Sequence, residues 1–204
     1  MKPLIFATNN ANKVTEVKSI LKGNFTIISL TEAGIEIDIP EPFNTLEENA
    51  YEKARVIHAI SGENCFAEDT GLEVDALHGE PGVKSARYSG EEKLPAGKGA
   101  RSEKNIDQLL LNLKGEKNRA AQFKTVICII LNGKQNIFDG ICKGTIIAER
   151  RGDSGFGYDP VFIPEGAKKT FAEMTLDEKN NFSHRKKAMN KLIHFLKEHE
   201  SAYY

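Results

Sequence analysis

The chain has 204 residues, enough for one substantial hydrophobic core, and its 28 Lys and Arg nearly balance 29 Asp and Glu. The formal charge of -1 argues against binding to nucleic acid through overall charge. The longest apolar run, "VICIIL", is too short to cross a bilayer. The chain opens directly on a short predicted strand, without the extended apolar region of a signal peptide. Three Cys residues without CxxC spacing are typical of reduced, buried thiols. We therefore expect a cytoplasmic protein without membrane or nucleic-acid partners.

The N-terminal third predicts two strands with a helix between them. The runs "PLIF" (3–6) and "FTIISL" (25–30) are strand candidates. Apolar residues recur at helical spacing from residue 14 to residue 21, which predicts a helix that ends near residue 22. Asn10 or Asn12 is the expected N-cap of this helix.

The clearest helical pattern is "TLEENAYEKARVIHAIS", residues 45–61. Thr45 and Glu48 have the spacing of a capping box, and apolar residues line one face of the helix behind them. Two strand candidates follow, "CFAEDT" (65–70), which ends in carboxylates, and the alternating "LEVDAL" (72–77).

The second half begins with a charged, glycine-rich stretch, residues 89–104, that we expect to be a surface loop. A helix is predicted over residues 104–115, and a hairpin of two long strands over residues 121–149 around Asn132-Gly133. Ser183 is expected to cap a last helix. These elements predict an α/β protein with a mixed twisted sheet and flanking helices. We expect one domain, residues 1–204, with a cleft between two lobes.

Glu68 and Asp69 form the first chemical candidate, because carboxylates at the end of a strand suit a hard cation such as Mg²⁺. The alternative is a strand-ending turn, in which Asp and Gly are chosen for geometry. The residues alone leave both interpretations open.

The segment "ATNNANK" places Asn9, Asn10 and Lys13 at the start of a predicted helix. Amides, an ammonium and a helix N-terminus together suit a phosphate group. An ordinary capped helix with a solvated lysine explains the same residues.

Two further stretches carry unusual chemistry. Residues 152–162, "GDSGFGYDPVF", can bring backbone amides and an aromatic face against a planar ligand, although a glycine-rich connection is the alternative. His184 and Arg185 lie in the first turn of the last helix, where cations oppose the helix dipole. A local rule broken in this way indicates either a function or a solvated basic face.

Five motifs in order, "ATNNANK", "TLEENAYEKA", "AEDTGLEVDALHGEPGVKSARYSG", "GFGYDPVF" and "EKNNFSHR", closely resemble the noncanonical purine nucleoside triphosphate pyrophosphatases, the inosine/xanthosine triphosphate pyrophosphatase family. The resemblance covers essentially the whole chain. It implies a homodimeric α/β enzyme that uses Mg²⁺ to hydrolyse ITP, dITP and XTP to the monophosphate and pyrophosphate, and so removes deaminated purines from the nucleotide pool.

The resemblance also implies roles for individual residues. Asp69 would be the catalytic carboxylate and would bind the metal together with Glu41, and Lys53 would face the phosphates. The substrate would be bound by residues of four motifs: Thr8, Asn9, Asn10, Lys13, Thr70, Phe156, Gly157, Tyr158, Asp159, Lys179, His184 and Arg185. The loop around residues 91–101 is longer than is usual in the family, and its contacts are not carried over.

Two rival functions remain open at this stage. A pyrophosphatase of the related Maf type would act on dTTP, UTP or modified pyrimidine nucleotides, and a panel of substrates separates the two. A nucleotide-binding module without catalysis would have no need of a carboxylate at Asp69.

Overall fold

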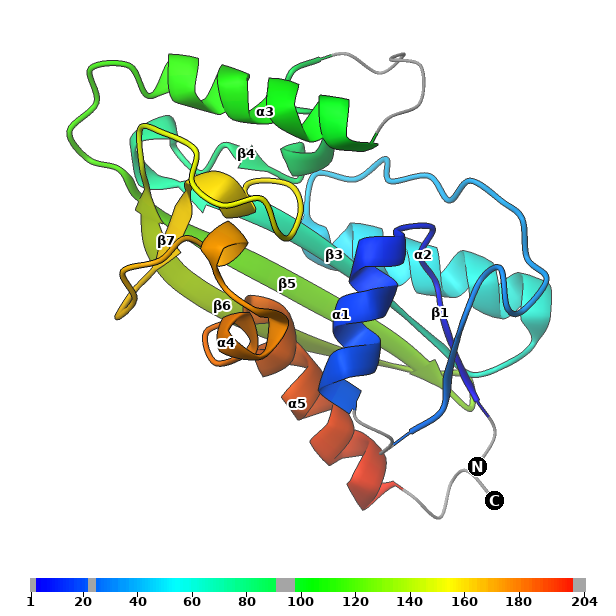
Figure 1. The fold of residues 1–204 in the computed structure, drawn as a ribbon. Coiled ribbons are helices and arrows are strands. Elements are labelled where there is room, and N and C mark those ends of the chain that lie inside the picture. The colour runs from blue at the N-terminus through cyan, green and yellow to red at the C-terminus, as the bar shows by residue number, and fades with distance from the viewer. Residues whose placement is uncertain (1–2, 22–24, 91–97, 200–204) are drawn as a thin grey trace. The chain divides into compact units, whose positions relative to one another are not determined.

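The computed structural model describes residues 3–21, 25–90 and 98–199. Its strands form one seven-stranded mixed sheet in the order β2-β1-β3-β5-β6-β7, with β4 paired to β3 (Figure 1). Strand β1 (Leu4–Phe6) is parallel to both β2 (Ile27–Ser29) and β3 (Cys65–Val74). Strand β4 (Pro81–Gly82) is antiparallel to β3. The α/β class and the mixed sheet are confirmed.

The chain divides into two compact units. The first takes in the described residues of 1–69, 125–140 and 184–204, and the second consists of those in 70–124 and 141–183. Three long strands, β3, β5 (Ala120–Leu131) and β6 (Lys134–Ile146), run from one unit into the other. The positions of the two units relative to one another are not determined, so the expected cleft and the single domain stay predictions.

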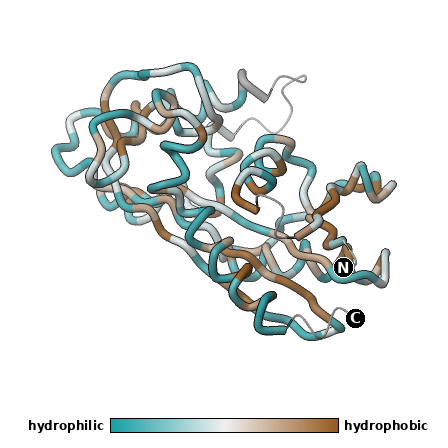
Figure 2. Tube along the Cα trace, turned by 60° about the horizontal axis from the view of Figure 1, so that its bottom comes forward, coloured by the Kyte–Doolittle hydropathy of each residue, from teal (hydrophilic) through white to brown (hydrophobic). Residues whose placement is uncertain are grey.

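The first unit contains the helices α1 (Ala11–Leu21), α2 (Leu46–Ser61) and α5 (His184–Glu198). The Asn10 side chain accepts a hydrogen bond from the Asn12 amide at 3.0 Å, so Asn10 is the cap of α1. Thr45 accepts from the Glu48 amide at 3.2 Å and caps α2, as predicted. The helices are banded in teal and brown in Figure 2, as expected when one face of each helix packs on a sheet.

The helices of the first unit cover both faces of its part of the sheet. Phe6 and Phe66 stack at 4.5 Å on one face, in a buried cluster with apolar side chains of α1 and α5. Alternate residues of a strand point to opposite faces, so Cys65 faces the other way. Its thiol lies 3.2 Å from the Ala54 carbonyl oxygen of α2. Helices α1 and α5 therefore share one face, and α2 covers the opposite one.

The second unit contains α3 (Lys98–Asn112), β7 (Phe162–Pro164) and the short α4 (Leu176–Asn180). Strand β7 is antiparallel to β6. The rings of Phe123, Phe162 and Phe171 form an aromatic core, with centroids 4.7 Å apart for the first two and 5.3 Å for the last two.

Two predictions of elements require correction, and one helix was missed. Residues 65–70 and 72–77 do not form two strands, because β3 runs unbroken to Val74. A side chain at Gly71 would approach the Gly82 carbonyl oxygen to 2.6 Å, so glycine allows β4 to pair there. Helix α3 begins at Lys98, inside the expected loop, whose residues 91–97 lie outside the described part of the chain. Helix α4 was not predicted.

The predicted hairpin is confirmed. Asn132 and Gly133 connect β5 to β6 with positive φ angles of 50° and 74°, the conformation that a two-residue turn of this kind requires.

Candidate active site

The site in the first unit forms where β1 ends beside β3. Phe6 is the last residue of β1 and pairs with Phe66, and the Ala7 amide donates to the Phe66 carbonyl at 2.8 Å. Beyond this point β3 continues through Glu68 and Asp69 while the neighbouring chain turns away into α1. The carboxyl end of a parallel strand therefore lies next to both carboxylates, which is where α/β sheets place their ligands.

Glu68 faces the layer of α1 and α5. Its side chain has the same parity along β3 as Phe66, so it points toward these helices. Both carboxylate oxygens accept hydrogen bonds from Arg185 at 2.8–3.0 Å, and Lys13 Nζ lies 3.3 Å from Oε1. Burial opposes the charged form, but Arg185 and Lys13 outweigh it and hold the pKa of Glu68 at about 2. Glu68 is therefore an anion at any physiological pH.

Arg185 is itself buried, with only 1% of its surface exposed. Besides Glu68, it donates through Nη1 to the carboxylate of Glu16 on α1. Burial works against its charge, but the two carboxylates more than compensate and raise its pKa. The cation that opposes the dipole of α5 thus has two buried anions as partners. Contact between Arg185 and a nucleoside stays a prediction.

Asp69 faces the opposite layer, where Lys53 projects from α2. The Lys53 ammonium lies 3.0 Å from Asp69 Oδ1 and 2.5 Å from Glu41 Oε1, so it bridges the two carboxylates. Burial raises the pKa of Asp69 above its usual 3.8, although Lys53 and Lys13 act in the other direction. Burial disfavours the charged form of Lys53, but Asp69 and Glu41 raise its pKa above 10.5. Asp69 is therefore a more basic carboxylate than usual, and it lies beside Lys53, which stays protonated.

The segment of residues 8–13 enters this site from β1. Thr8 Oγ1 accepts from the Asn10 amide at 3.2 Å, and Asn10 caps the helix. Asn9 Nδ2 donates to the Ile37 carbonyl at 2.8 Å. Lys13 is the member of the segment that contacts a carboxylate, Glu68. The Asn10 cap is confirmed, the expectation of a solvated lysine is wrong because Lys13 pairs with the buried Glu68, and phosphate binding stays a prediction.

The second unit holds another group of the expected site residues. Asp159 is buried, and its Oδ2 accepts from the Phe156 amide at 2.9 Å and from Lys179 Nζ at 2.5 Å. Lys179 also lies over the Phe156 ring, 5.2 Å from its centroid. The hydroxyl of Tyr158 donates to the Ser85 carbonyl at 2.9 Å. Asp159 therefore fixes both the loop that carries Phe156 and the ammonium of Lys179.

The remaining expected residues are distributed over both units. Thr70 is half-buried in β3, and Gly157 lies in the 156–159 loop with φ of 63°. His184 is buried at the first position of α5. The structure thus gathers Lys13, Glu41, Lys53, Asp69 and Arg185 in the first unit, and Phe156, Asp159 and Lys179 in the second.

Two residues of the site were not selected from the sequence. Glu16 binds Arg185 beside Glu68, and the buried Asn49 holds the backbone of Phe43. A signal existed for Glu16, because it lies three residues after Lys13 and one before the buried Val17, on the covered face of α1. Glu68 was noticed beside Asp69, but its partner Arg185 lies 117 positions away.

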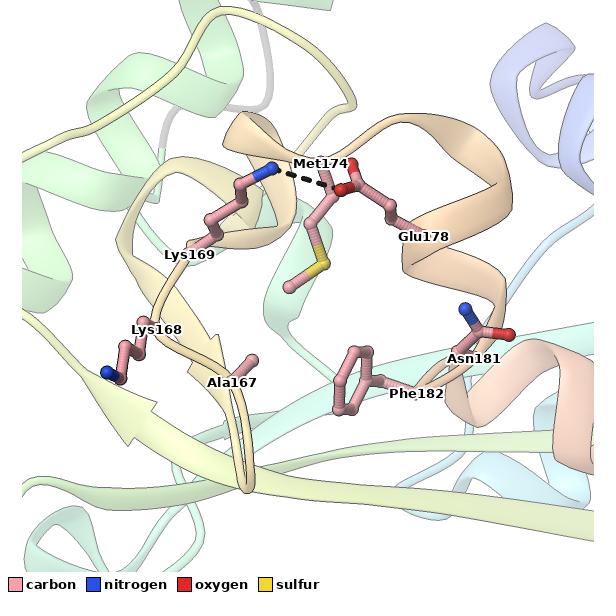
Figure 3. A pocket seen from close by; sticks show the side chains of 7 residues that line it. All are labelled: Ala167, Lys168, Lys169, Met174, Glu178, Asn181 and Phe182. Carbon is pink, nitrogen blue, oxygen red and sulfur yellow. Dashed lines mark hydrogen bonds and ion pairs between the residues drawn. The ribbon is translucent and has the colours of Figure 1, made fainter.

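A pocket in the second unit lies outside these groups. Met174 and Phe182 form apolar walls, and an ion pair of 3.0 Å joins Lys169 to Glu178 at one side (Figure 3). None of the expected site residues lines it.

Among the described residues, 3–21, 25–90 and 98–199, no helix is long and apolar enough to cross a membrane. Within the same residues no group of three or more His, Cys, Asp or Glu side chains is arranged to hold a metal ion. A metal ion in the first unit would therefore have Asp69 and Glu41 as its protein ligands, and water or substrate oxygens would complete its coordination.

The model of the Ham1 family matches residues 4–195, nearly the entire chain. The chain belongs to the Ham1 family. A relative from Flavobacterium psychrophilum, named dITP/XTP pyrophosphatase, is 50% identical over 95% of this chain and 98% of its own length. This match, together with the family model, confirms the resemblance noted from the motifs.

Solved structures of Ham1 proteins have the same fold. The Ham1 protein of Coxiella burnetii is 34% identical with a TM-score of 0.84, over 97% of this chain and all of the other. That of Staphylococcus aureus is 36% identical with a TM-score of 0.82, over 96% and 98% of the two chains.

Proposed function

We propose that this Ham1 protein hydrolyses the noncanonical purine nucleoside triphosphates dITP, XTP and ITP to the monophosphate and pyrophosphate. The observation that carries the proposal is the Lys53 ammonium between Asp69 and Glu41. The Asp69 carboxylate, which can act as a base, and the Lys53 cation thus lie together in the site that forms where β1 ends and α1 begins. The dITP/XTP pyrophosphatase names of relatives at 50% identity support the substrate class. The reaction removes deaminated purines from the nucleotide pool.

The two carboxylates next to Lys53 suit Mg²⁺, and we propose Mg²⁺ as the cofactor. Oxygen ligands are those that this ion prefers, and Lys53 already places a cation within 3.0 Å of both carboxylates. Asp69 and Glu41 would hold the metal. When bound, Mg²⁺ supplies positive charge to the triphosphate and to the leaving pyrophosphate.

Asp69 is the proposed general base of the reaction. Its carboxylate accepts a proton from the water that attacks the α-phosphorus, and its raised pKa makes it a better acceptor than an ordinary aspartate. Lys53 remains protonated because its own pKa is raised, so it can stabilise negative charge on the phosphates throughout the reaction. Release of pyrophosphate in one piece follows from attack at the α-phosphorus.

The remaining residues are proposed to bind substrate. Thr8, Asn9, Asn10 and Lys13 would hold the triphosphate at the start of α1, where backbone N–H groups favour anions. Thr70 would donate a hydroxyl hydrogen bond to a phosphate oxygen. The nucleoside would contact a set of residues from the 156–159 loop, α4 and α5: Phe156, Gly157, Tyr158, Asp159, Lys179, His184 and Arg185. We further propose a homodimer in the cytoplasm.

The test is a substrate panel with purified protein and Mg²⁺. ITP, dITP and XTP are each incubated with the enzyme beside ATP, GTP, dTTP and UTP, and quenched samples are separated by chromatography. We expect IMP and pyrophosphate from ITP, with no IDP at early times. Early IDP would contradict attack at the α-phosphorus. Preference for dTTP or UTP would favour the Maf-type activity, and binding without turnover would favour a sensor.

A further inference from the structure

Glu41 lies on a segment without helix or strand structure, residues 35–43, which we call the Glu41 segment. Its side chains alternate in exposure: residues 35, 37, 39 and 41 are half-buried, whereas 36, 38, 40 and 42 are exposed. This alternation is that of an extended chain with one side against the protein. Glu41 is therefore on the covered side. A segment of this kind depends on other elements for its position.

The buried residue Asn49 provides such a contact at the end of the Glu41 segment. Its Oδ1 accepts from the Phe43 amide at 3.0 Å, and its Nδ2 donates to the Phe43 carbonyl at 3.0 Å. Both ends of one side-chain amide thus bind the backbone of a single residue, two positions after Glu41. Asn49 has no exposed surface, whereas Phe43 is 40% exposed, so both hydrogen bonds are partly buried.

Asn49 and Lys53 lie on the same face of α2, because residues four apart in a helix are stacked one turn above the other. Helix α2 therefore carries Lys53 and, through Asn49, also holds the segment that carries Glu41, the partner of Lys53. At the other end of the Glu41 segment, Asn9 Nδ2 donates to the Ile37 carbonyl at 2.8 Å. Glu41 lies between these two anchors, and its carboxylate is 2.5 Å from Lys53 Nζ.

We infer that Asn49 is a positioning residue which, through the backbone of Phe43, holds the Glu41 carboxylate against Lys53. The catalytic consequence rests on the function proposed above, whereas the structural one does not. A carboxylate displaced by about 1 Å can cost about a hundredfold in rate, so an anchor next to Glu41 matters for turnover as well as for folding.

The structural part is tested by amide exchange at Phe43, one of few N–H groups here because Pro40 and Pro42 have none. In Asn49→Ala we expect this amide to exchange roughly tenfold faster or more, since two hydrogen bonds are lost. Asn49→Asp keeps an acceptor for the Phe43 N–H and should lie between Ala and wild type. Unchanged exchange in Asn49→Ala would overturn the inference, whatever the protein's activity.

The matched control is Asn105→Ala. Asn105 is also a buried amide that holds loop backbone, through the Ser89 amide at 2.9 Å and the Ser85 carbonyl at 3.3 Å, but in the second unit. It should leave exchange at Phe43 unchanged. Equal acceleration in both variants would mean general loosening of the protein and would overturn a specific role for Asn49.

The catalytic part is tested by a double-mutant cycle with Glu41→Gln, measured as kcat/KM for ITP and as the Mg²⁺ concentration for half activation. In the wild-type background, Asn49→Ala should lower kcat/KM by about tenfold or more. If Asn49 acts through Glu41, the same change made in the Glu41→Gln protein should alter kcat/KM by less than about threefold. A double variant whose loss in kcat/KM equals the product of the two single losses would show that Asn49 acts independently of Glu41, and would overturn the inference. Absence of ITP cleavage by the wild type would reject the proposed function and leave the exchange result to decide.

Discussion

Arg185 donates to both carboxylate oxygens of Glu68 at 2.8–3.0 Å, although 117 positions separate the two residues in sequence. Neither side chain is more than 1% exposed. The pair fixes the first turn of α5 to β3, and with it the neighbouring His184. A third residue, Glu16, binds the same guanidinium and links α1 to both.

Arg185→Ala should lower the free energy of unfolding by about 3–5 kcal/mol, because it leaves two buried carboxylates without their shared cation. Urea unfolding followed by circular dichroism measures the loss. The matched control is Arg150→Ala, which removes partly exposed ion pairs to Glu103 and Asp107 and should cost less than about 1 kcal/mol. Similar losses in the two variants would contradict the structural role of Arg185. A large loss also means that selectivity for the purine base must be measured on folded protein only.

Stability should fall in acid as Glu68 is protonated. Its pKa is about 2 in the folded protein against an ordinary value of 4.5, so Glu68 contributes fully above pH 4.5. The contribution is lost as the pH falls toward 2, since the unfolded chain binds the proton first. The free energy of unfolding is measured between pH 2 and 6 for wild type and Glu68→Gln. Curves of the same slope in this window would contradict the depressed pKa.

The Asp69 carboxyl of the metal-free protein should titrate above its usual pKa of 3.8 and should respond to Glu41. Burial raises the pKa of Asp69, and the negative charge of Glu41 raises it further. Glu41→Gln removes that charge, so the pKa of Asp69 should fall. The carboxyl carbon of Asp69 is followed by NMR as a function of pH in both proteins without Mg²⁺, because a bound cation lowers the pKa of the carboxylates that hold it. A pKa that stays in place or rises in Glu41→Gln would contradict this coupling between the two carboxylates.

Gly140 should be intolerant of a side chain. A Cβ atom there would clash with the His184 carbonyl oxygen and lie 2.5 Å from the Ala188 amide nitrogen, both backbone atoms of α5. Gly140→Ala should therefore destabilise the protein by about 1–3 kcal/mol and displace the start of α5. The control is Ile137→Ala, a large exposed side chain on the same strand. Thermal unfolding of both compares the effects, and a Gly140→Ala protein as stable as its control would mean that α5 can shift at no cost.

Local signals in the sequence predicted the elements that local chemistry determines. Asn10 and Thr45 cap their helices, and Asn132-Gly133 turns the hairpin, because each effect acts over a few residues. The end of β3 was misplaced because "EDTG" has the composition of a turn. Pairing with β4 at Gly82, a tertiary effect, keeps it extended.

The candidate site was predictable only in part, for a similar reason. The motifs identified Asp69, Lys53 and Glu41, and the structure brings these three together. Adjacent residues of a strand point to opposite faces, but the motifs could not show which helices cover the face of Glu68 and which the face of Asp69. Nor could they show that Glu16 pairs with Arg185 across 169 positions. Such partners follow from sheet order and helix packing, which no single stretch of sequence contains.

The most direct test of the account is the turnover of ITP by Asp69→Asn. This change keeps the shape of the side chain but removes the proton acceptor and one proposed metal ligand. We expect turnover to fall by at least about a hundredfold while circular dichroism shows a folded protein. Asp139→Asn, an exposed aspartate paired with Lys191, is the matched control and should turn over ITP at the wild-type rate. Near-wild-type release of IMP and pyrophosphate by folded Asp69→Asn would contradict the central role of this carboxylate.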